Sequence, residues 1–261
     1  MTKDAATFRQ RFLAGGPLTG SFLKIAHTMP AEILGTLGFD FVVIDEEHAP
    51  INRESTDRII LACKAAEMAC LVRVRNAEPS EILSALDCGA DGVLVPHVDS
   101  AAKAAAVVAA ARYKSGSRGY AATTRAGEFG AKTMGDHMTI EDQRAVVIAM
   151  IEDTEAIEDI DAIVATEGLD AVFIGRADLA VAFGQTTAGT APVIAATKAI
   201  CSAANARNVT ICAMVGSDKD THMMADLGAS AVIVASDQTF LRDAARERLF
   251  GIRLLMENRK T

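Results

Sequence analysis

The chain lacks tryptophan, has only two tyrosines among its 261 residues, and carries no block of basic residues. So few aromatic rings leave little surface for stacking against bases or sugars. The net charge is −8, from 26 lysines and arginines against 34 aspartates and glutamates. Because a nucleic-acid partner needs clustered positive charge, we expect no nucleic acid to bind.

Long apolar runs and paired cysteines are also missing, and we expect no signal peptide. The longest apolar runs have the length of a strand and fall far short of a membrane span, so we expect no membrane contact. Residues 1–16 carry charges where a signal peptide needs its apolar region. The five cysteines are scattered without a CxxC pair, which is typical of small buried residues in a reducing compartment. These absences predict a cytoplasmic protein.

The chain does have a regular alternation of short apolar runs with helical patterns. The apolar runs recur at intervals of roughly 20–50 residues, the spacing of a (β/α)8 barrel. We therefore predict an α/β protein whose residues 1–261 form a single TIM-barrel domain. A doubly wound open sheet is the competitor, but the GxGxxG turn that it would place after the first strand is absent.

The expected strands cover residues 20–26, 39–44, 69–74, 92–97, 146–152, 171–175, 209–215 and 231–235. The expected helices cover residues 5–13, 30–37, 52–68, 79–89, 100–113, 157–166, 191–206 and 239–257, and one more helix ends at Gly228. Residues 114–141 interrupt the rhythm with glycines, arginines and hydroxyl side chains. A loop this long in a compact domain is usually functional or mobile.

The stretch FDFVVIDEEHAP, residues 39–50, runs from an apolar strand into Asp45, Glu46, Glu47 and His48. Three carboxylates and a histidine at the tip of a buried strand are costly unless they bind or react with something. In a parallel barrel the carboxyl ends of the strands meet at one mouth, where active sites lie. The alternative is an acidic, solvated loop without function. We favour a functional site because loops at strand ends often carry function.

Polar residues at the other predicted strand ends extend this candidate site. The full set is Asp45, Glu47, His48, Arg73, His97, Glu152, Asp178 and Asp237. Glu152 and Asp178 each follow an apolar strand, and two facing carboxylates would hold a hard divalent cation. The alternative is that both only cap helices.

The spacing of Asp45 and His48 suits an imidazole that a carboxylate orients as a general base; a surface histidine is the alternative. Arg73 lies inside a buried strand and needs a carboxylate, from the protein or from a ligand. We expect His137 and His222 on the surface.

The motifs GFDFVVIDEEHAP, LVRV, GADGVLVPHVDSAAKA, IEDTEAIEDIDAI and GLDAVFIGRADLAVAFG together resemble the HpcH/HpaI family of class II pyruvate-dependent aldolases. With the arginine and glycine run of residues 112–119, the resemblance extends from about Gly20 to Asp237. It implies a (β/α)8 barrel whose last helix is swapped between subunits. It also implies a homo-oligomer, often a hexamer built as a trimer of dimers.

The resemblance implies a reaction in which a 4-hydroxy-2-oxo acid is cleaved reversibly to pyruvate and an aldehyde. Glu152 and Asp178 would bind Mg²⁺, Mn²⁺ or Co²⁺, which the pyruvate half of the substrate chelates. Arg73 would contact the keto oxygen, and His48, held by Asp45, would be the acid and base.

The resemblance also assigns the substrate contacts. The amides around Ala177 and Asp178 would receive the pyruvate carboxylate. Glu47 would contact the substrate, and Arg125, in the segment 119–127, would line the aldehyde pocket. No Schiff-base lysine is required, and Lys24 is the only lysine inside a predicted strand.

Three positions depart from the family pattern. Glu46 replaces a common glycine and could alter aldehyde choice. Met150 replaces a glutamine that touches pyruvate in some members. Arg176 replaces a common proline and would bind an anionic substrate tail or pair with Glu46 or Glu47.

Two other functions compete with the aldolase. One is a lyase acting on a CoA thioester, of the citrate- and malyl-CoA-lyase type, which needs a nucleotide groove. The other is a non-catalytic barrel that binds keto acids and would have a disrupted site.

Overall fold

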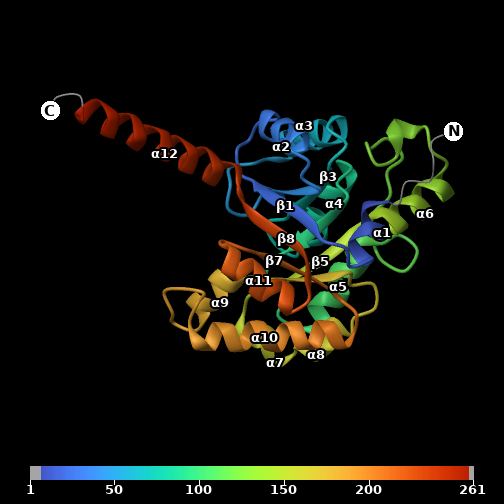
Figure 1. The fold of residues 1–261 in the computed structure, drawn as a ribbon. Helices are drawn as coiled ribbons and strands as arrows, with labels where there is room; N and C mark the ends of the chain where they lie inside the picture. The colour runs from blue at the N-terminus through green and yellow to red at the C-terminus, as the bar shows by residue number, and fades with distance from the viewer. Residues whose placement is uncertain (1–6, 259–261) are drawn as a thin grey trace.

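A computed structural model, which describes residues 7–258, shows eight parallel strands closed into one barrel in sequence order (Figure 1). The strands are β1 Leu18–Leu23, β2 Phe41–Asp45, β3 Ala69–Arg73, β4 Gly92–Val95, β5 Val146–Ile151, β6 Ala171–Ile174, β7 Thr210–Met214 and β8 Ala229–Ser236. Pairing of β1 with both β2 and β8 completes the ring. The predicted (β/α)8 fold is confirmed.

Helices follow the strands and surround the barrel (Figure 1). They are α1 Phe8–Leu13, α2 Met29–Thr36, α3 Arg53–Ala65, α4 Pro79–Asp87, α5 Ala101–Ala111, α6 Met134–Arg144, α7 Thr154–Glu158, α8 Ile160–Val164, α9 Arg176–Ala182, α10 Ala191–Ala206, α11 Asp218–Asp226 and α12 Asp237–Glu257, with a 3₁₀ turn η1 at Glu128–Gly130. The single helix predicted at 157–166 is two short helices, α7 and α8. Residues 5 and 6 of the first predicted helix lie outside the described residues.

Alternation along the strands divides the apolar residues into two cores. Side chains two apart point to the same face of a strand. In β2, Phe41 and Val43 join the cluster inside the barrel, while Val42 and Ile44 join the cluster between strands and helices. β5 repeats this division with Ile148 inside and its neighbours outside. The next inward position on each strand therefore faces the mouth of the barrel.

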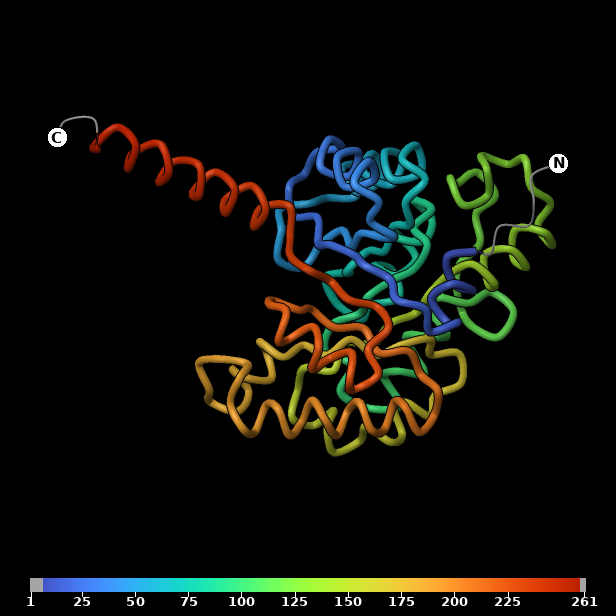
Figure 2. Tube along the Cα trace, viewed as in Figure 1, coloured from blue at the N-terminus to red at the C-terminus, as the bar shows by residue number. Residues whose placement is uncertain are grey.

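The segment between α5 and β5 was expected to be irregular up to residue 141, but residues 134–144 form α6. His137 was expected on the surface and is buried, with its ring against the rings of Tyr113 and Tyr120. His222 is exposed, as predicted. Because this segment follows a helix and leads into a strand, it lies at the amino-terminal end of the barrel, where α6 contacts α1 (Figure 2).

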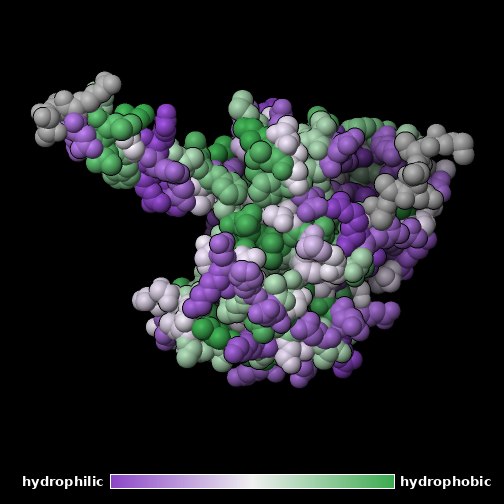
Figure 3. Space-filling view, in the orientation of Figure 1, coloured by the Kyte–Doolittle hydropathy of each residue, from purple (hydrophilic) through white to green (hydrophobic). Residues whose placement is uncertain are grey.

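The last helix, α12, projects away from the barrel (Figures 1 and 2). Apolar surface gathers toward its far end (Figure 3). The exposed apolar side chains on it are Phe240, Leu241, Leu249, Phe250, Ile252, Leu254, Leu255 and Met256. Among residues 7–258, no helix has the length and apolar character to cross a membrane.

Candidate active site at the barrel mouth

The alternation of the strands brings charged side chains from separate strands to the mouth. Asp45 continues the inward series of Phe41 and Val43, and Arg73 continues that of Leu71 on the next strand. Asp45 and Arg73 are also direct partners in the register of β2 and β3. Inward side chains beyond the last apolar layer thus form a polar ring above the apolar interior.

Asp45 is fully buried and its carboxylate is saturated with donors. Arg73 donates from Nε to Oδ1 at 2.9 Å and from Nη2 to Oδ2 at 2.7 Å. The Lys24 ammonium lies 2.9 Å from Oδ2. Burial alone would raise the pKa of Asp45, but the hydrogen bonds and charge of Arg73, assisted by Lys24 and a backbone amide, lower it to about 2. Asp45 is therefore a fixed anion at neutral pH.

His48 lines the mouth, but the structure does not join its ring to Asp45. Asp45 accepts a hydrogen bond from the backbone N–H of His48, at 3.1 Å. The imidazole instead approaches Glu47, with Nε2 at 3.7 Å from Oε2. The prediction that Asp45 orients the imidazole directly was wrong, because the tight turn after β2 brings the amide of His48 back to the carboxylate. Asp45 positions the backbone that carries His48.

Glu47 lies close to three of the predicted site residues: His48, Arg73 and His97. Its Oε2 lies 3.2 Å from Nη1 of Arg73, and its Oε1 lies 4.0 Å from Nε2 of His97. Oε2 is buried and, among the described residues, has no hydrogen-bond partner of good geometry. Such an oxygen retains the capacity to accept a proton or a hydrogen bond from a ligand.

Glu152 is buried at the end of β5, and one oxygen is held while the other is not. Oε1 accepts a hydrogen bond from the backbone N–H of His97 at 2.8 Å. A side chain on Gly175 would come within 2.8 Å of Oε2, so the site depends on a glycine there. Burial raises the pKa of Glu152 to about 7; His97 opposes the shift, while the charges of Asp178 and Glu47 add to it.

The two carboxylates predicted to hold a metal, Glu152 and Asp178, interact electrostatically across the ends of β5 and β6. Within residues 7–258, no group of three or more His, Cys, Asp and Glu side chains is arranged as a metal site. A hard divalent ion needs only one or two protein carboxylates when water and substrate supply the other oxygens. Nδ1 of His97 lies 3.5 Å from Oε1 of Glu152, yet burial still raises the pKa of this carboxylate, so a cation beside Glu152 and Asp178 would favour the charged form and the donor set fits such an ion.

A cavity of about 610 Å³ opens at this mouth. Phe22, Met150 and Phe173 form apolar parts of its lining, while Lys24, His48 and Arg73 supply polar parts. Ala177 and Asp178, in the first turn of α9, also line it. Met150 is buried, so this part of the wall offers a thioether in place of an amide.

Two of the departures from the family pattern, Glu46 and Arg176, are paired with other residues of the chain. Glu46 is buried outside the mouth cavity, where it accepts a hydrogen bond from Thr56 and lies near Arg75. Arg176 lines the cavity, but it pairs with Asp220 through two hydrogen bonds of 2.6 and 2.7 Å. The predicted pairing of Arg176 with Glu46 or Glu47 was therefore wrong.

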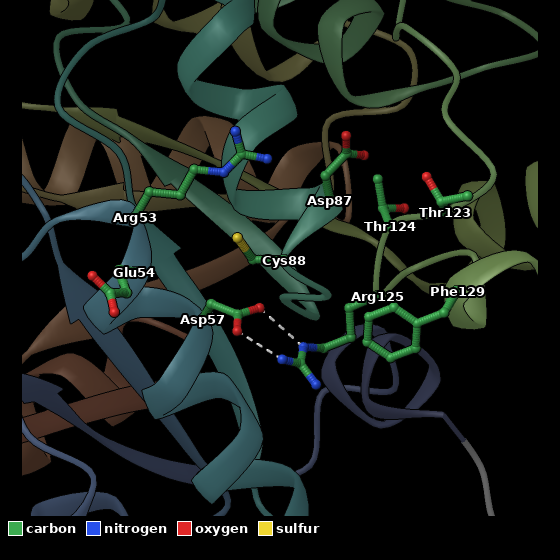
Figure 4. Close-up of a pocket in the computed structure, with 9 residues that line it drawn as sticks. All are labelled: Arg53, Glu54, Asp57, Asp87, Cys88, Thr123, Thr124, Arg125 and Phe129. Carbon is green, nitrogen blue, oxygen red and sulfur yellow. Dashed lines mark hydrogen bonds and ion pairs between the residues drawn. The ribbon is translucent and has the colours of Figure 1, made fainter.

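Arg125 does not reach the mouth of its own barrel. It lines a separate cavity, where its guanidinium pairs with Asp57 and lies over the ring of Phe129 (Figure 4). This cavity shares no lining residue with the mouth cavity. The reason is topological: the segment that carries Arg125 precedes β5, so it lies at the opposite end of the barrel from the strand tips.

Lys24 follows β1 and Asp237 follows β8, so both lie at the mouth end of the barrel. Asp237 accepts hydrogen bonds from the backbone N–H groups of Lys24 and Ile25, both at 2.9 Å, so it ties the β1 and β8 ends together. Lys24 enters the mouth because it is two residues beyond the inward Phe22. The same alternation in the sequence could have identified it.

Comparison with known proteins supports the assignment that the geometry suggests. The profile of the family described as HpcH/HpaI aldolase/citrate lyase matches residues 18–244. The chain is 33% identical over 230 residues to a 5-keto-4-deoxy-D-glucarate aldolase of Escherichia coli, covering 87% of this chain and 89% of that protein. A Citrobacter koseri protein of the same name is 32% identical over the same length.

Two solved structures share the fold closely. An HpcH/HpaI aldolase/citrate lyase family protein from Burkholderia cenocepacia J2315 superposes with a TM-score of 0.89 at 28% identity, covering 94% of this chain and 98% of that one. The citrate synthase SbnG gives a TM-score of 0.87 at 28% identity, with coverage of 96% and 99%. The resemblance seen in the sequence is thus confirmed, and the chain belongs to the HpcH/HpaI aldolase/citrate lyase family.

Proposed function

We propose that this enzyme is a class II aldolase that reversibly cleaves 4-hydroxy-2-oxo acids to pyruvate and an aldehyde. Family membership and the aldolase relatives indicate a carbon–carbon lyase. The observation that best supports the finer assignment is that His48, Arg73 and Asp178 line one cavity, and that the buried Glu152 interacts electrostatically with Asp178. The three lining residues follow or end three different strands.

The reaction requires a base beside the C4 hydroxyl and positive charge beside the keto oxygen. The C4 hydroxyl loses its proton while the C3–C4 bond breaks, and the electrons of that bond move toward the keto oxygen. His48 lines the cavity with an exposed ring and would take the hydroxyl proton, then return a proton to C3 to form pyruvate. Glu47, beside that ring, would stabilise the imidazolium that forms.

Arg73 would stabilise the charge that develops on the keto oxygen. Its guanidinium is held by Asp45 and Glu47 and lies 4.9 Å from the centre of the Phe22 ring. An arginine offers five N–H donors, so these contacts leave donors for a substrate. Because the group is already oriented, it need not reorganise as the charge appears.

Glu152 and Asp178 would hold the divalent cation, Mg²⁺, Mn²⁺ or Co²⁺. When bound, such a cation supplies positive charge beside the keto oxygen and the carboxylate of the pyruvate half. The first-turn amides at Ala177 and Asp178 lack partners within α9 and would receive that carboxylate.

The test is release of pyruvate from a panel of 4-hydroxy-2-oxo acids, before and after treatment with a chelator. We expect turnover that chelation removes and that added Mn²⁺ restores. Turnover that survives complete chelation would contradict the metal role. No turnover on any member of the panel would contradict the aldolase assignment.

A second function, a citrate-type condensation or CoA-thioester lyase, is favoured by the likeness to the citrate synthase SbnG. It predicts binding of a tricarboxylate or of CoA, which titration calorimetry would detect. Binding of CoA together with silence on the hydroxy-oxo-acid panel would favour this second function over the first.

We also propose a homo-oligomer, a hexamer in its full form, in which α12 covers a neighbouring subunit. An apolar groove of about 800 Å³ runs beside the root of α12, lined in part by Ile33, Leu37 and Phe39. The exposed apolar face of α12 needs such a surface. Light scattering of the full chain and of a variant with Leu254→Asp and Leu255→Asp tests this. The variant should have a lower mass, and equal masses would contradict the swap.

A further inference from the structure

His97 follows β4 at the mouth and has a backbone conformation that is uncommon outside glycine. Its φ is 54°, in the left-handed region. Among residues 7–258, the other non-glycine residues with a positive φ all lie between a helix and the next strand; they are Glu67, Glu128, Phe129 and Asn208. A residue in this region costs free energy and persists where the surrounding contacts hold it. The His97 side chain is 56% exposed, so side-chain packing does not explain its conformation.

Three features around His97 hold this turn in place. Pro96 has no backbone N–H and therefore cannot continue the hydrogen bonding of β4. The backbone N–H of Val98 donates to the carbonyl oxygen of Met150 at 3.2 Å. Nδ1 of His97 lies 3.1 Å from Oδ2 of Asp153. The turn is thus attached to the end of β5 by its backbone and by its ring.

The left-handed turn directs the backbone N–H of His97 at Glu152. This N–H donates to Oε1 of the buried carboxylate at 2.8 Å. The imidazole pairs with Asp153, and its Nδ1 is 3.5 Å from the same oxygen. A hydrogen bond to a carboxylate is stronger than one between neutral groups. Because the donor belongs to the main chain, the side chain at position 97 matters chiefly through the φ that it allows.

The hydrogen bond from His97 also decides which oxygen of Glu152 remains available. β5 lies between β4 and β6, and Oε1 is held from the β4 side. Oε2 lies beside Gly175, which follows β6, since a Cβ there would be 2.8 Å from this oxygen. Asp178, the other proposed metal ligand, follows Gly175 in the first turn of α9. The amide of His97 therefore leaves Oε2 on the β6 side, where Asp178 also lies.

We propose that His97 is a positioning residue of the metal site, and that it acts through its left-handed backbone and its amide. The amide orients the carboxylate of Glu152 for the cation, while the imidazole attaches the turn to Asp153. Groups that hydrogen-bond to metal ligands commonly change metal affinity by about 10- to 100-fold. This inference rests on the proposed function, because that function requires the metal.

The test uses substitutions of His97 that differ in their tolerance of a positive φ. Glycine adopts this conformation freely and asparagine adopts it more readily than most residues, whereas a β-branched residue resists it. We expect His97→Gly and His97→Asn to bind Mn²⁺ within about threefold of the wild type, measured by titration calorimetry without substrate. His97→Val should bind Mn²⁺ at least about tenfold more weakly, because its amide no longer points at Glu152.

Glu67→Val is the matched control for backbone strain. Glu67 has a φ of 53°, is exposed, and lies between α3 and β3 at the amino-terminal end of the barrel. This substitution should lower the melting temperature about as much as His97→Val and leave the Mn²⁺ affinity within about twofold of the wild type. If His97→Val does not fold, His97→Ala imposes a milder form of the same strain. Its affinity should then fall between those of His97→Gly and Glu152→Gln.

Equal Mn²⁺ affinities for His97→Gly and His97→Val would overturn the proposal, because the two variants differ in the φ that they allow. A loss in His97→Gly and His97→Asn as large as that in His97→Val would also overturn it, since the imidazole would then be the group that matters. A loss of affinity in Glu67→Val would assign the effect to general destabilisation.

The same experiment separates the role of His97 from the aldolase function. If the wild type binds Mn²⁺ and releases pyruvate while every His97 variant matches it, the role of His97 fails and the aldolase function stands. If the variants rank as expected but no 4-hydroxy-2-oxo acid is cleaved, the role of His97 is supported and the aldolase function fails. A wild type that binds no Mn²⁺ would reject the metal site and the role of His97 together.

Discussion

The two ends of the barrel carry the same kinds of charged side chain and use them differently. At the amino-terminal end, Asp40, Asp91 and Asp170 each precede a strand and accept a hydrogen bond from a backbone N–H of the preceding strand. Each also pairs with an arginine. At the mouth, Oε2 of Glu47 lies near Arg73 without a hydrogen bond of good geometry, and among the described residues a hydrogen bond holds only Oε1 of Glu152.

The comparison shows how one fold separates stability from function. Each of the three amino-terminal aspartates joins its own strand to the preceding one. Their carboxylates already have backbone and arginine partners, so they stabilise the barrel. At the mouth, Asp178 lines the cavity and Glu152 interacts with it electrostatically, so these carboxylates are available to a ligand. Mutations at the two ends should therefore differ in which measurement they change.

The largest effect should come from His48→Ala. Loss of the proposed acid and base should lower kcat/KM by about 10²- to 10⁴-fold. Affinity for Mn²⁺, measured by electron paramagnetic resonance, should stay within about threefold of the wild-type value, because the proposed metal ligands are Glu152 and Asp178. A parallel loss of turnover and metal affinity would contradict the role given to His48.

At the opposite end, Asp170→Asn should reduce stability and spare the chemistry. It leaves Arg112, whose side chain is buried, without its anionic partner. Breaking a buried pair in this way costs about 3–5 kcal/mol of unfolding free energy, measurable by urea titration. The value of kcat per folded molecule should be unchanged. A large fall in kcat without a change in the urea midpoint would break the proposed division between the two ends.

Asp45 lies at the mouth, but its carboxylate has partners within the protein, as the amino-terminal aspartates do. The pH dependence of stability tests whether it is a buried anion. Its pKa falls from 3.8 to about 2 on folding, so its contribution to stability is complete above pH 3.8 and is lost as the pH falls through 2. The wild type should lose about 2 kcal/mol more unfolding free energy than Asp45→Asn between pH 5 and pH 2. Identical slopes for the two proteins would show that Asp45 is not the buried anion described here.

The affinity of the mouth for Mn²⁺ should depend on the protonation of Glu152. Because the pKa of Glu152 is about 7 without metal, protons compete with Mn²⁺ below that pH. Lowering the pH from 7 to 6 should weaken Mn²⁺ binding by up to about tenfold, measured by calorimetry. The pH dependence should be absent in Glu152→Gln, whose affinity is lower throughout. A wild-type affinity that does not vary between pH 6 and 8 would contradict this.

The smallest effect should come from Glu46→Gln. The side chain contacts Thr56 and Arg75 outside the cavity, and its pKa is raised by burial. We expect kcat/KM to change by less than about threefold for any aldehyde, because Glu46 does not line the mouth cavity. A selective change for one class of aldehyde would restore the earlier prediction that Glu46 influences substrate choice.

The fold and the mouth were predictable because both follow from a period of two. The alternation in residues 41–45 sends Asp45 inward, and the same rule places Arg73 and Lys24. What the sequence could not reveal was which atoms of neighbouring residues meet. The spacing of Asp45 and His48 is the same whether the ring or the backbone amide turns toward the carboxylate.

Contacts between distant residues were harder still. Arg176 and Asp220 are 44 positions apart, and no local pattern in either segment predicts their pairing. His137 gave a polar, surface-like pattern, yet two tyrosines enclose it. For Arg125 the chain order alone, helix before and strand after, was a usable signal that it lies away from the mouth.

The absence of a side chain at position 175 has a consequence for how this enzyme can change. Even a methyl group there would meet Glu152 at a distance that ordinary atoms do not tolerate. Gly175→Ala would then displace the side chain of Glu152, and the variant would resemble one that lacks a proposed metal ligand. Even the smallest side chain is therefore excluded from position 175 unless Glu152 moves.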